Sequence, residues 1–600
     1  MSCRIEDYGL IGDCETAALV GRNGSIDWLC WPAFDSDACF AALLGTEKHG
    51  RWQIAPAREI TGTSRRYWDN TLILETRFET ADGAVDLIDF MPPRGNASDV
   101  VRLVRGVRGR IRMHMQLVIG FGFGVDIPWV KKSEDGSALL AICGQDMTVL
   151  RTPVETRGED LTTVADFEVG EGETVPFVLT YGPSHLPVPK PINPADALQD
   201  TEAFWTEWCS RCTYEGEYRD LVMRSLITLK AQTYAPTGGI VAAPTTSLPE
   251  KLGGSRNWDY RFCWLRDATF TLLALTNSGY TEEASAWYRW LLRAAAGSPA
   301  NMQIMYGIMG QRRLLEWEAS WLPGYEGAKP VRVGNAAHAQ LQLDVYGELI
   351  DAFHQWRVVA KLEMDETSWA MECAVLVHLA EVWDQPDHGI WERRGDGRHY
   401  VSSKVMTWVA FDRGIKSAET FGFKAPLEKW RALRDAIHLD VCAKGFDPEL
   451  NSFVESYGSK MLDASILLLP SVGFLPPEDP RVRGTLVAIE QYLMRDGFVL
   501  RHDPREAEKQ PAEGAFLACT LWLADAYVLA GEFVHAQNLF DRVVAIANDL
   551  GLLAEEYDTA AGRQTGNFPQ ALTHIALINT AHNLSAAKGS TEKPAMQRSK

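Results

Sequence analysis

The sequence lacks any long apolar segment. Its 600 residues contain no run of about 18 apolar residues, the length that a membrane-spanning helix needs, and residues 1–10 hold no apolar stretch like that of a secretory leader. Low-complexity sequence is also missing before a short polar tail, residues 589–600, which we expect to be disordered. These absences argue against a membrane protein and lead us to expect a cytoplasmic protein with a globular core.

Positively charged residues are also fewer than negatively charged ones. Lys and Arg total 59 against 79 Asp and Glu, which gives a formal net charge of −20. An acidic surface repels nucleic acid and anionic membranes, so we expect neither as a partner. A neutral small molecule suits this charge better, and the 20 Trp residues, a side chain on which sugars commonly stack, favour a small neutral sugar as the substrate.

Cysteine shows no pattern of paired ligands. The 11 Cys residues are an odd number and are scattered, and Cys209 and Cys212 form the only C-x-x-C pair. A structural zinc site would use a second pair of this kind. The sequence therefore predicts reduced thiols and no metal site.

What the sequence does contain changes character at a proline-rich segment, residues 186–194. Before it, turn signals are frequent and apolar residues recur with a period near two. Asn23-Gly24 and Asp82-Gly83 each separate two short apolar runs, which is the pattern of a β-hairpin. Many strands joined by short turns predict an antiparallel β-sandwich over residues 1–185.

Helical periodicity follows a linker with one helix, residues 186–214. About twelve helical segments can be counted from there by periodicity and breakers, among them 336–358 and 459–468. The first of these two shows the pattern well, because four apolar residues recur at i, i+4: Leu341, Val345, Leu349 and Phe353.

Consecutive helices without intervening strands can bury all their apolar stripes by closing into a ring of six antiparallel hairpins. The predicted fold class is therefore multidomain β + α, an N-terminal antiparallel β-sandwich followed by an (α/α)6 barrel, or six-hairpin toroid, over residues 215–588. An open helical solenoid is the alternative, but no repeat of about 34 or 40 residues supports it.

One loop of the helical half carries a candidate catalytic group. Gly389–Arg393 lies between two helical segments and combines Trp391 with Glu392. A Trp offers a face to a pyranose ring, and a Glu offers a proton to the leaving oxygen of a glycosidic bond. A solvated Glu beside a Trp that packs between helices is the plain alternative, and this loop alone does not decide between the two.

A second segment, Arg256–Asp267, is rich in aromatic and charged residues. Trp258 and Asp259 lie within it, and Arg266 with Asp267 begins a helix. The last two residues could either cap that helix or grip two hydroxyls of one sugar ring. The four aromatic residues nearby favour the sugar.

A third segment contains two adjacent carboxylates. Glu555 and Glu556 lie before the last helical segment and are followed by Gly566–Gln570 and His574. Adjacent Glu residues on a loop are usually solvated, and they matter for catalysis only if one of them faces the pocket of Glu392.

Taken in order, these motifs resemble those of the glucoamylase-type inverting glycoside hydrolases (glycoside hydrolase family 15), in particular their bacterial trehalase-like branch. The resemblance extends over nearly the whole chain and implies the same β-sandwich and (α/α)6 barrel. It rests on these segments: Ile5–Asp13, Gly24–Pro32, Arg256–Asp267, Arg332–Ala337, Gly389–Glu392, Glu555–Asp558 and Gly566–Gln570.

The resemblance also implies roles for individual residues. It makes Glu392 the general acid and Glu555, from an Ala/Pro-Glu-Gln motif, the general base. Glu556 stands where the family motif has Gln, so the choice between the two adjacent Glu residues stays open. The Trp-x-Arg-Asp motif that holds the nonreducing glucosyl ring matches Trp264, Arg266 and Asp267. The further substrate-binding candidates are Trp258, Asp259, Trp391, Arg393 and Glu556.

We therefore expect inverting hydrolysis of an α-glucosidic bond, first of all α,α-trehalose to two glucoses. Arg393 stands where glucoamylases often have a second Glu, which counts against long starch chains. An exo-acting glucoamylase or glucodextranase on short α-glucans is the alternative. A disaccharide phosphorylase would lack the second carboxylate, Glu555, and a noncatalytic sugar-binding protein would need neither Glu392 nor Glu555.

The expected chemistry requires no cofactor, because two carboxylates and water suffice. The resemblance to actinobacterial trehalase-like proteins leaves a dependence on phosphate and magnesium open. The sequence likewise leaves open whether the chain forms a homo-oligomer.

Overall fold

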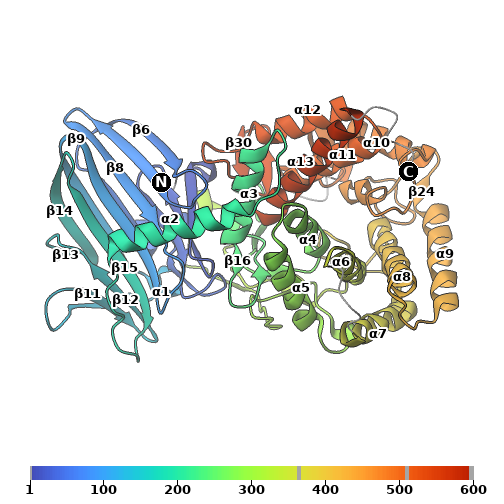
Figure 1. Cartoon of the computed structure of the whole chain (residues 1–600), viewed down its shortest axis with the longest axis horizontal. Helices are drawn as coiled ribbons and strands as arrows, with labels where there is room; N and C mark the ends of the chain where they lie inside the picture. The colour runs from blue at the N-terminus through green and yellow to red at the C-terminus, as the bar shows by residue number, and fades with distance from the viewer. Residues whose placement is uncertain (1–2, 361–365, 507–512, 593–600) are drawn as a thin grey trace.

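The computed structural model describes residues 3–360, 366–506 and 513–592. A β domain forms one side of the molecule and a ring of helices the other, which confirms the predicted fold class (Figure 1). Part of the expected tail belongs to the last helix, which ends at Glu592, and residues 593–600 lie outside the described residues.

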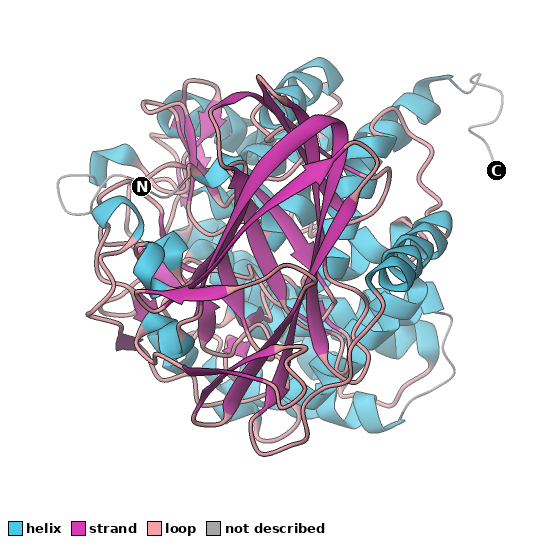
Figure 2. Cartoon of the chain, turned by 90° about the vertical axis from the view of Figure 1, so that its left-hand side faces the viewer, coloured by secondary structure: helices cyan, strands magenta, loops and turns pink. Residues whose placement is uncertain are grey.

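The β domain consists of two antiparallel layers that share one long strand. This strand, β9, pairs with β8 and β15 along its first half and with β5 and β14 along its second half. It passes from one layer to the other between Gly106 and Arg110. At Gly106 a side chain has no room, because its Cβ would lie 2.0 Å from the Gly170 carbonyl oxygen. Figure 2 shows the strands of this domain in front of the helices. The strands are β1 Tyr8–Gly12, β2 Ala17–Gly21, β3 Ser25–Cys30, β4 Ala38–Phe40, β5 Arg51–Pro56, β6 Ile60–Tyr67, β7 Leu74–Thr80, β8 Gly83–Phe90, β9 Ser98–Val118, β10 Trp129–Lys132, β11 Leu139–Cys143, β12 Asp146–Arg151, β13 Arg157–Glu159, β14 Thr162–Gly170 and β15 Thr174–Pro183.

A single helix, α2 (Pro194–Ser210), leads from the β domain to the ring (Figure 1). The sequence favours a helix start at this position, because the Asn193 side chain caps the helix and Pro194 occupies its first turn.

The inner layer of the ring closes on itself. Each of its segments contacts the next, and the last of them, α13, returns to α4. In order, the described segments of this layer are α4 Ala268–Asn277, α6 Asp344–Ala360, α8 Val401–Phe421, the short 3-10 helix η7 Ala464–Leu468, α11 Leu517–Leu529 and α13 Ala571–Glu592.

The outer layer covers the inner one and is exposed on its far side. The helices of the two layers differ in burial. The inner helix α11 is buried along almost its whole length, whereas the outer helix α12 buries only one stripe, as an amphipathic helix does: Ala536, Leu539, Phe540 and Val543. The outer segments are α3 Arg219–Ala231, α5 Thr281–Ala295, α7 Glu366–Val382, α9 Leu427–Lys444, α10 Pro480–Leu493 and α12 Phe533–Val544.

Two of the predicted helical segments differ from the structure. The segment expected at 336–358 becomes a short 3-10 helix at Ala336–Ala339, started by the Asn335 side chain, and then α6 from Asp344. Leu341 therefore lies before the helix rather than on its stripe. The segment expected at 459–468 shortens to η7.

Short hairpins and loops at the ends of the ring helices carry the residues of interest. Their strands are β16 Thr233–Tyr234, β17 Gly239–Ile240, β18 Thr246–Pro249, β19 Asn257–Asp259, β20 Cys263–Trp264, β21 Met305–Tyr306, β22 Trp317–Glu318, β23 Arg332–Val333, β24 Phe446–Asp447, β25 Ser452–Phe453, β26 Met494–Arg495, β27 Phe498–Val499, β28 Ala515–Phe516, β29 Glu556–Asp558 and β30 Arg563–Thr565.

The β domain packs directly against some of these loops. The Trp28 indole donates to the Pro244 carbonyl at 2.8 Å, and the Arg261 guanidinium donates to the Ser36 carbonyl at 2.6 Å. The buried Arg65 pairs with Asp549 at 2.7 Å. The β domain thus holds the pocket-forming loops in place from outside the ring.

No helix of the described chain combines the length with the apolar character that a membrane crossing needs.

We predict that Arg102→Met will strongly destabilise the β domain. Arg102 and Asp89 are both fully buried and joined at 2.7 Å, and Arg102 also donates to the Gly24 carbonyl at 2.8 Å. Removing the cation leaves a buried carboxylate unpaired, which should cost about 3–5 kcal/mol in the free energy of unfolding. Arg112→Met, which removes a largely exposed ion pair with Glu168, is the control and should change stability little. Chemical denaturation of the full chain measures both, and equal effects would contradict the prediction.

Candidate active site

A cavity of about 400 Å³ opens among the loops of the ring. Five of its lining residues were sequence candidates and come from two segments: Trp258 and Arg266 from the first, and Trp391, Glu392 and Arg393 from the second. The remaining lining residues are Glu250, Ser255, Arg256, Tyr260, Arg332, Asn335, Ala337, Arg394, Arg501, His502 and Phe516.

Glu392 lies in the loop between α7 and α8, and the backbone there turns sharply. Its own φ is +57°, and Gly389 has φ +68°, so the loop uses two left-handed positions to turn the carboxyl toward the cavity. The Trp264 indole donates to Glu392 Oε1 at 2.6 Å, and Arg266 Nη1 lies 3.8 Å from the same oxygen. Burial raises the pKa of the Glu392 carboxyl, although Arg266 and the indole oppose this shift.

Glu555 is linked to Glu392 through two aromatic side chains, Tyr260 and Trp264. The Tyr260 hydroxyl donates to Glu555 Oε1 at 2.5 Å, and the Tyr260 and Trp264 rings meet edge to face with centroids 5.3 Å apart. Glu392, Trp264, Tyr260 and Glu555 therefore form one continuous chain of contacts. Burial raises the pKa of Glu555 to about 7, and the charge of Glu250 adds to the shift.

The backbone around Glu555 is fixed by its neighbours. Its N–H donates to the Asn567 carbonyl at 3.2 Å, and its own carbonyl accepts from the Leu517 N–H at 3.1 Å. Two residues earlier, the Leu553 N–H donates to His574 Nε2, so this His acts as a buried neutral acceptor, and burial lowers its pKa to about 3. Rigid support of this kind suits a residue that must be placed accurately.

Arg266 and Asp267 form an ion pair at 2.7 Å directly beside Glu392. Asp267 precedes the first turn of α4, yet among the described residues its side chain makes no capping hydrogen bond. The capping role considered from the sequence is therefore not what the structure shows. Both of the Asp267 carboxylate oxygens accept from Arg266 instead.

Asp259 does not lie on the cavity wall. Its carboxylate is fully buried, bonded to Arg261 at 2.7 and 2.9 Å and to the Gly334 N–H at 2.9 Å. The expectation that Asp259 contacts substrate does not fit this position. Because Arg261 also reaches the β domain, Asp259 instead connects the aromatic loop to that domain.

Trp258 lines the cavity but is already in contact with two cations. The guanidinium carbons of Arg332 and Arg394 each lie 4.4 Å from its ring centre, and its indole N–H donates to Glu250 at 3.0 Å. Glu316 links the two arginines, at 3.4 Å to Arg332 and 2.6 Å to Arg394. The Trp258 side chain is thus part of a charged rim.

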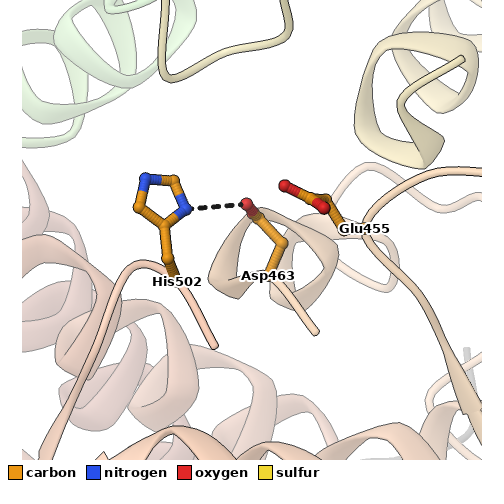
Figure 3. A group of neighbouring side chains, drawn as sticks. All are labelled: Glu455, Asp463 and His502. Atoms are coloured by element: carbon orange, nitrogen blue, oxygen red, sulfur yellow. Dashed lines mark ion pairs between the residues drawn. The ribbon is translucent and has the colours of Figure 1, made fainter. Parts of the chain in front are cut away.

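Arg393 belongs to a cluster that by residue type could hold a metal ion: Glu455, Asp463 and His502, drawn in Figure 3. Arg393 Nη2 lies 2.5 Å from Glu455 and 2.9 Å from His502 Nδ1, and the same ring nitrogen lies 3.4 Å from Asp463. The guanidinium supplies the positive charge of this group. Asp463 also accepts from the Trp391 indole at 2.9 Å, which ties the cluster to the Glu392 loop.

Several residues of the site were not singled out from the sequence. Tyr260 lies inside the quoted aromatic segment, where its partner could not be seen. Glu250 follows Pro249 and Arg501 follows Leu500, and neither segment carries a recognisable motif. Only the fold brings the two side chains together, at 2.9 Å. Glu513 joins them, 2.9 Å from Arg501. No local pattern could have indicated this group.

Comparison with known proteins now decides the family. The model described as "Glycosyl hydrolases family 15" matches residues 216–582. The chain belongs to this family. A second model, "Trehalase-like, N-terminal", matches residues 1–187, so the two models together extend over both domains of this family 15 glycosyl hydrolase.

Curated relatives resemble the chain over its full length. A protein named Trehalase from Mycolicibacterium smegmatis is 36% identical over 96% of this chain and 90% of its own. One of the same name from Thermoplasma volcanium is 35% identical over 97% of this chain and 94% of its own. Among solved structures, a bacterial glucoamylase in complex with acarbose superposes with a TM-score of 0.69, covering 97% of this chain and 94% of its own at 13% identity, which shows a shared fold.

We predict that Gly566→Ala will impair turnover through Glu555. An added Cβ at this position would lie 2.6 Å from Glu555 Oε2, so the carboxyl would have to move. A shift of that size at a catalytic group should cost about 10²-fold in turnover.

Gly562→Ala is a matched control. Both glycines have positive φ, +77° and +64°, so both variants should lose about 1–2 kcal/mol of stability from backbone strain. At Gly562 the nearest atom to an added Cβ is 3.9 Å away. Steady-state kinetics and thermal unfolding of the two variants separate the effects; similar turnover in both would contradict the prediction.

Proposed function

We propose that this protein hydrolyses α,α-trehalose to two glucose molecules, with Glu392 as general acid and Glu555 as general base. One observation carries the chemistry: the half-buried Glu392 carboxyl and the buried Glu555 carboxyl lie at opposite ends of a single chain of contacts. Each is held by an aromatic donor, Trp264 for the first and Tyr260 for the second. Relatives named trehalase support trehalose as the substrate, since several of them align with more than nine-tenths of this chain. Family membership supports inversion.

The two carboxyls need opposite protonation states for this reaction. Glu392 has to give a proton to the glycosidic oxygen, and burial raises its pKa so that it keeps that proton nearer neutrality than a free Glu would. Glu555 has to be ionised to draw a proton from the attacking water. In an inverting enzyme that water sits between the base and the sugar, which requires the two carboxyls to be about 6.5–9.5 Å apart.

The glucosyl ring to be cleaved is expected beside the Arg266–Asp267 pair. Asp267 can accept from sugar hydroxyls, and Arg266 can donate to them while it stays paired with the Asp267 carboxylate. Because Arg266 also lies near Glu392, the same cation links ring binding to the general acid.

The second glucose is expected on the side of Arg393. Glu455 and His502 fix this guanidinium, and it follows the general acid directly in the chain. A fixed donor suits the hydroxyls of a single sugar unit and favours a disaccharide over a long chain.

We predict faster glucose release from trehalose than from maltose, isomaltose, kojibiose or soluble starch. Inversion at one of the two anomeric carbons should give equal amounts of α- and β-glucose in the first turnovers, whereas a retaining enzyme would give α-glucose alone. Proton NMR during early hydrolysis measures the ratio. A preference for maltooligosaccharides would reject the substrate, and α-glucose alone would reject the mechanism.

We also predict that Glu392→Gln and Glu555→Gln will each lower kcat by about 10²–10⁴-fold while substrate still binds. The wild-type rate should fall as the pH drops through the pKa of Glu555, because the base becomes protonated, and fall again as the pH rises through the pKa of Glu392. Burial raises both pKa values, so the bell-shaped pH–rate profile should lie at higher pH than a profile set by two unperturbed Glu residues. The Glu555→Gln profile should lack the acid limb, and an acid limb that persists would mean another residue is the base.

A further inference from the structure

Close to Glu555 lies a group of five charged side chains, here called the charge cluster: Glu250, Glu513, Glu556, Arg256 and Arg501. Three of them, Glu250, Arg256 and Arg501, also line the cavity, whereas Glu556 is fully buried. Carboxylate oxygens of its three Glu residues lie within 4.8 Å of one another. Three carboxylates face two guanidiniums, so the cluster would hold one excess negative charge if every group were ionised. Uncompensated charge is costly in a buried site, and a proton on one carboxyl would remove it.

Two of the three carboxyls are well supplied with cations. Glu513 accepts from Arg501 Nε at 3.1 Å and from Arg501 Nη2 at 2.9 Å, and lies 3.1 Å from Arg256. Glu250 accepts from Arg501 at 2.9 Å, from the Trp258 indole at 3.0 Å and also from Arg256. Both carboxyls therefore accept several charge-assisted hydrogen bonds.

Glu556 is held differently. Its Oε1 makes one contact, at 3.2 Å, with the same Arg501 nitrogen that already serves Glu250 and Glu513. Its Oε2 is buried and has no hydrogen-bond partner among the residues that the structure describes. The Thr565 hydroxyl is in the same state.

These two oxygens border one small space. A Cβ added to Gly514 would lie 3.0 Å from Glu556 Oε2 and 3.1 Å from Thr565 Oγ1. The space is thus left open by a glycine and faced by a carboxyl oxygen and a hydroxyl that both lack a partner among the described residues. Either the hydroxyl donates to an ionised carboxylate or a protonated Oε2 donates to the hydroxyl, and the charge balance of the cluster favours the second.

We propose that Glu556 carries a proton in the working enzyme and acts as a neutral positioning residue beside the general base. This inference rests on the proposed function, in which Glu555 must be ionised. The groups that face Glu556 are Glu250, Glu513 and Arg501 from neighbouring loops and Glu555 from its own segment. A neutral Glu556 removes the excess charge of the cluster and adds no repulsion to the ionisation of Glu555.

The electrostatics agree with this geometry. Burial and the negative charges of Glu250 and Glu513 raise the pKa of Glu556 well above its usual range, whereas Arg501 and His502 hold the pKa of Glu513 low despite burial. The extra proton thus belongs on Glu556 rather than on Glu513.

Infrared spectroscopy of the full-length protein at neutral pH tests the protonation directly. The difference spectrum between wild type and Glu556→Gln should show loss of a protonated carboxyl band. Glu168→Gln is the control, because that exposed residue is paired with Arg112, and its difference spectrum should show loss of a carboxylate band. Loss of a carboxylate band in Glu556→Gln would overturn the proposal.

A second variant keeps the test independent of how well Glu556→Gln folds. Thr565→Val removes the acceptor beside Oε2, so the protonated carboxyl band should move to higher frequency. An unchanged band would place the proton elsewhere and overturn the proposal.

The pH dependence of trehalose hydrolysis gives a third readout, independent of the size of kcat. If Glu556 is neutral, Glu556→Gln removes no charge, and the midpoint of the acid limb should stay within about 0.3 pH units of wild type. If Glu556 were ionised, its removal would lower that midpoint by about one unit or more. Absence of any wild-type hydrolysis would reject the proposed function, while the infrared result would still decide the state of Glu556.

Discussion

A carboxylate can be buried only where a cation, a hydrogen-bond donor or a proton accompanies it, and the pocket of this family 15 glycosyl hydrolase is built around that constraint. Asp267 lies against Arg266, Glu455 against Arg393, and Glu250 with Glu513 against Arg501. The two proposed catalytic carboxyls have no cation so close in the described chain: Arg266 lies 3.8 Å from Glu392, and Glu555 forms no ion pair there. Each has an aromatic donor instead, which holds the group in place and leaves it free to gain or lose a proton.

This arrangement explains why the pocket of an acidic protein contains so many arginines. They are partners of buried carboxylates rather than a positive surface, and the cavity remains suited to a neutral sugar. The β domain takes part in the same network, since Arg261 bonds both to Asp259 beside the pocket and to Ser36 of that domain. Activity and the integrity of the domain interface are therefore connected through a pair of residues that do not touch the cavity.

Sequence reasoning predicted what depends on local pattern and on ordered motifs. The periodicity of α6, the break near residue 186 and the loop that carries Glu392 could all be read from neighbouring residues. The start of α6 was predicted eight residues too early, because Asn335 starts a separate short helix that the apolar stripe does not reveal. Glu250 and Arg501 could not be predicted, since their meaning comes from a contact between residues 251 positions apart. Asp259 shows the converse: its motif was recognised, but only the structure shows its carboxylate bound to Arg261.

The closure of the inner ring by α13 against α4 also has a consequence for how the protein is made. Helix α4 emerges from the ribosome about 300 residues before the helix that it must contact, and domains generally fold as units during synthesis. The β domain is complete long before that point and can fold first. The ring, by contrast, keeps an open apolar edge until the final segment has been translated. Glu555, in the loop before β29, also lies just ahead of α13 in the chain. The site is thus among the last parts of the molecule to form, so truncated products of translation should carry a folded β domain but no working site.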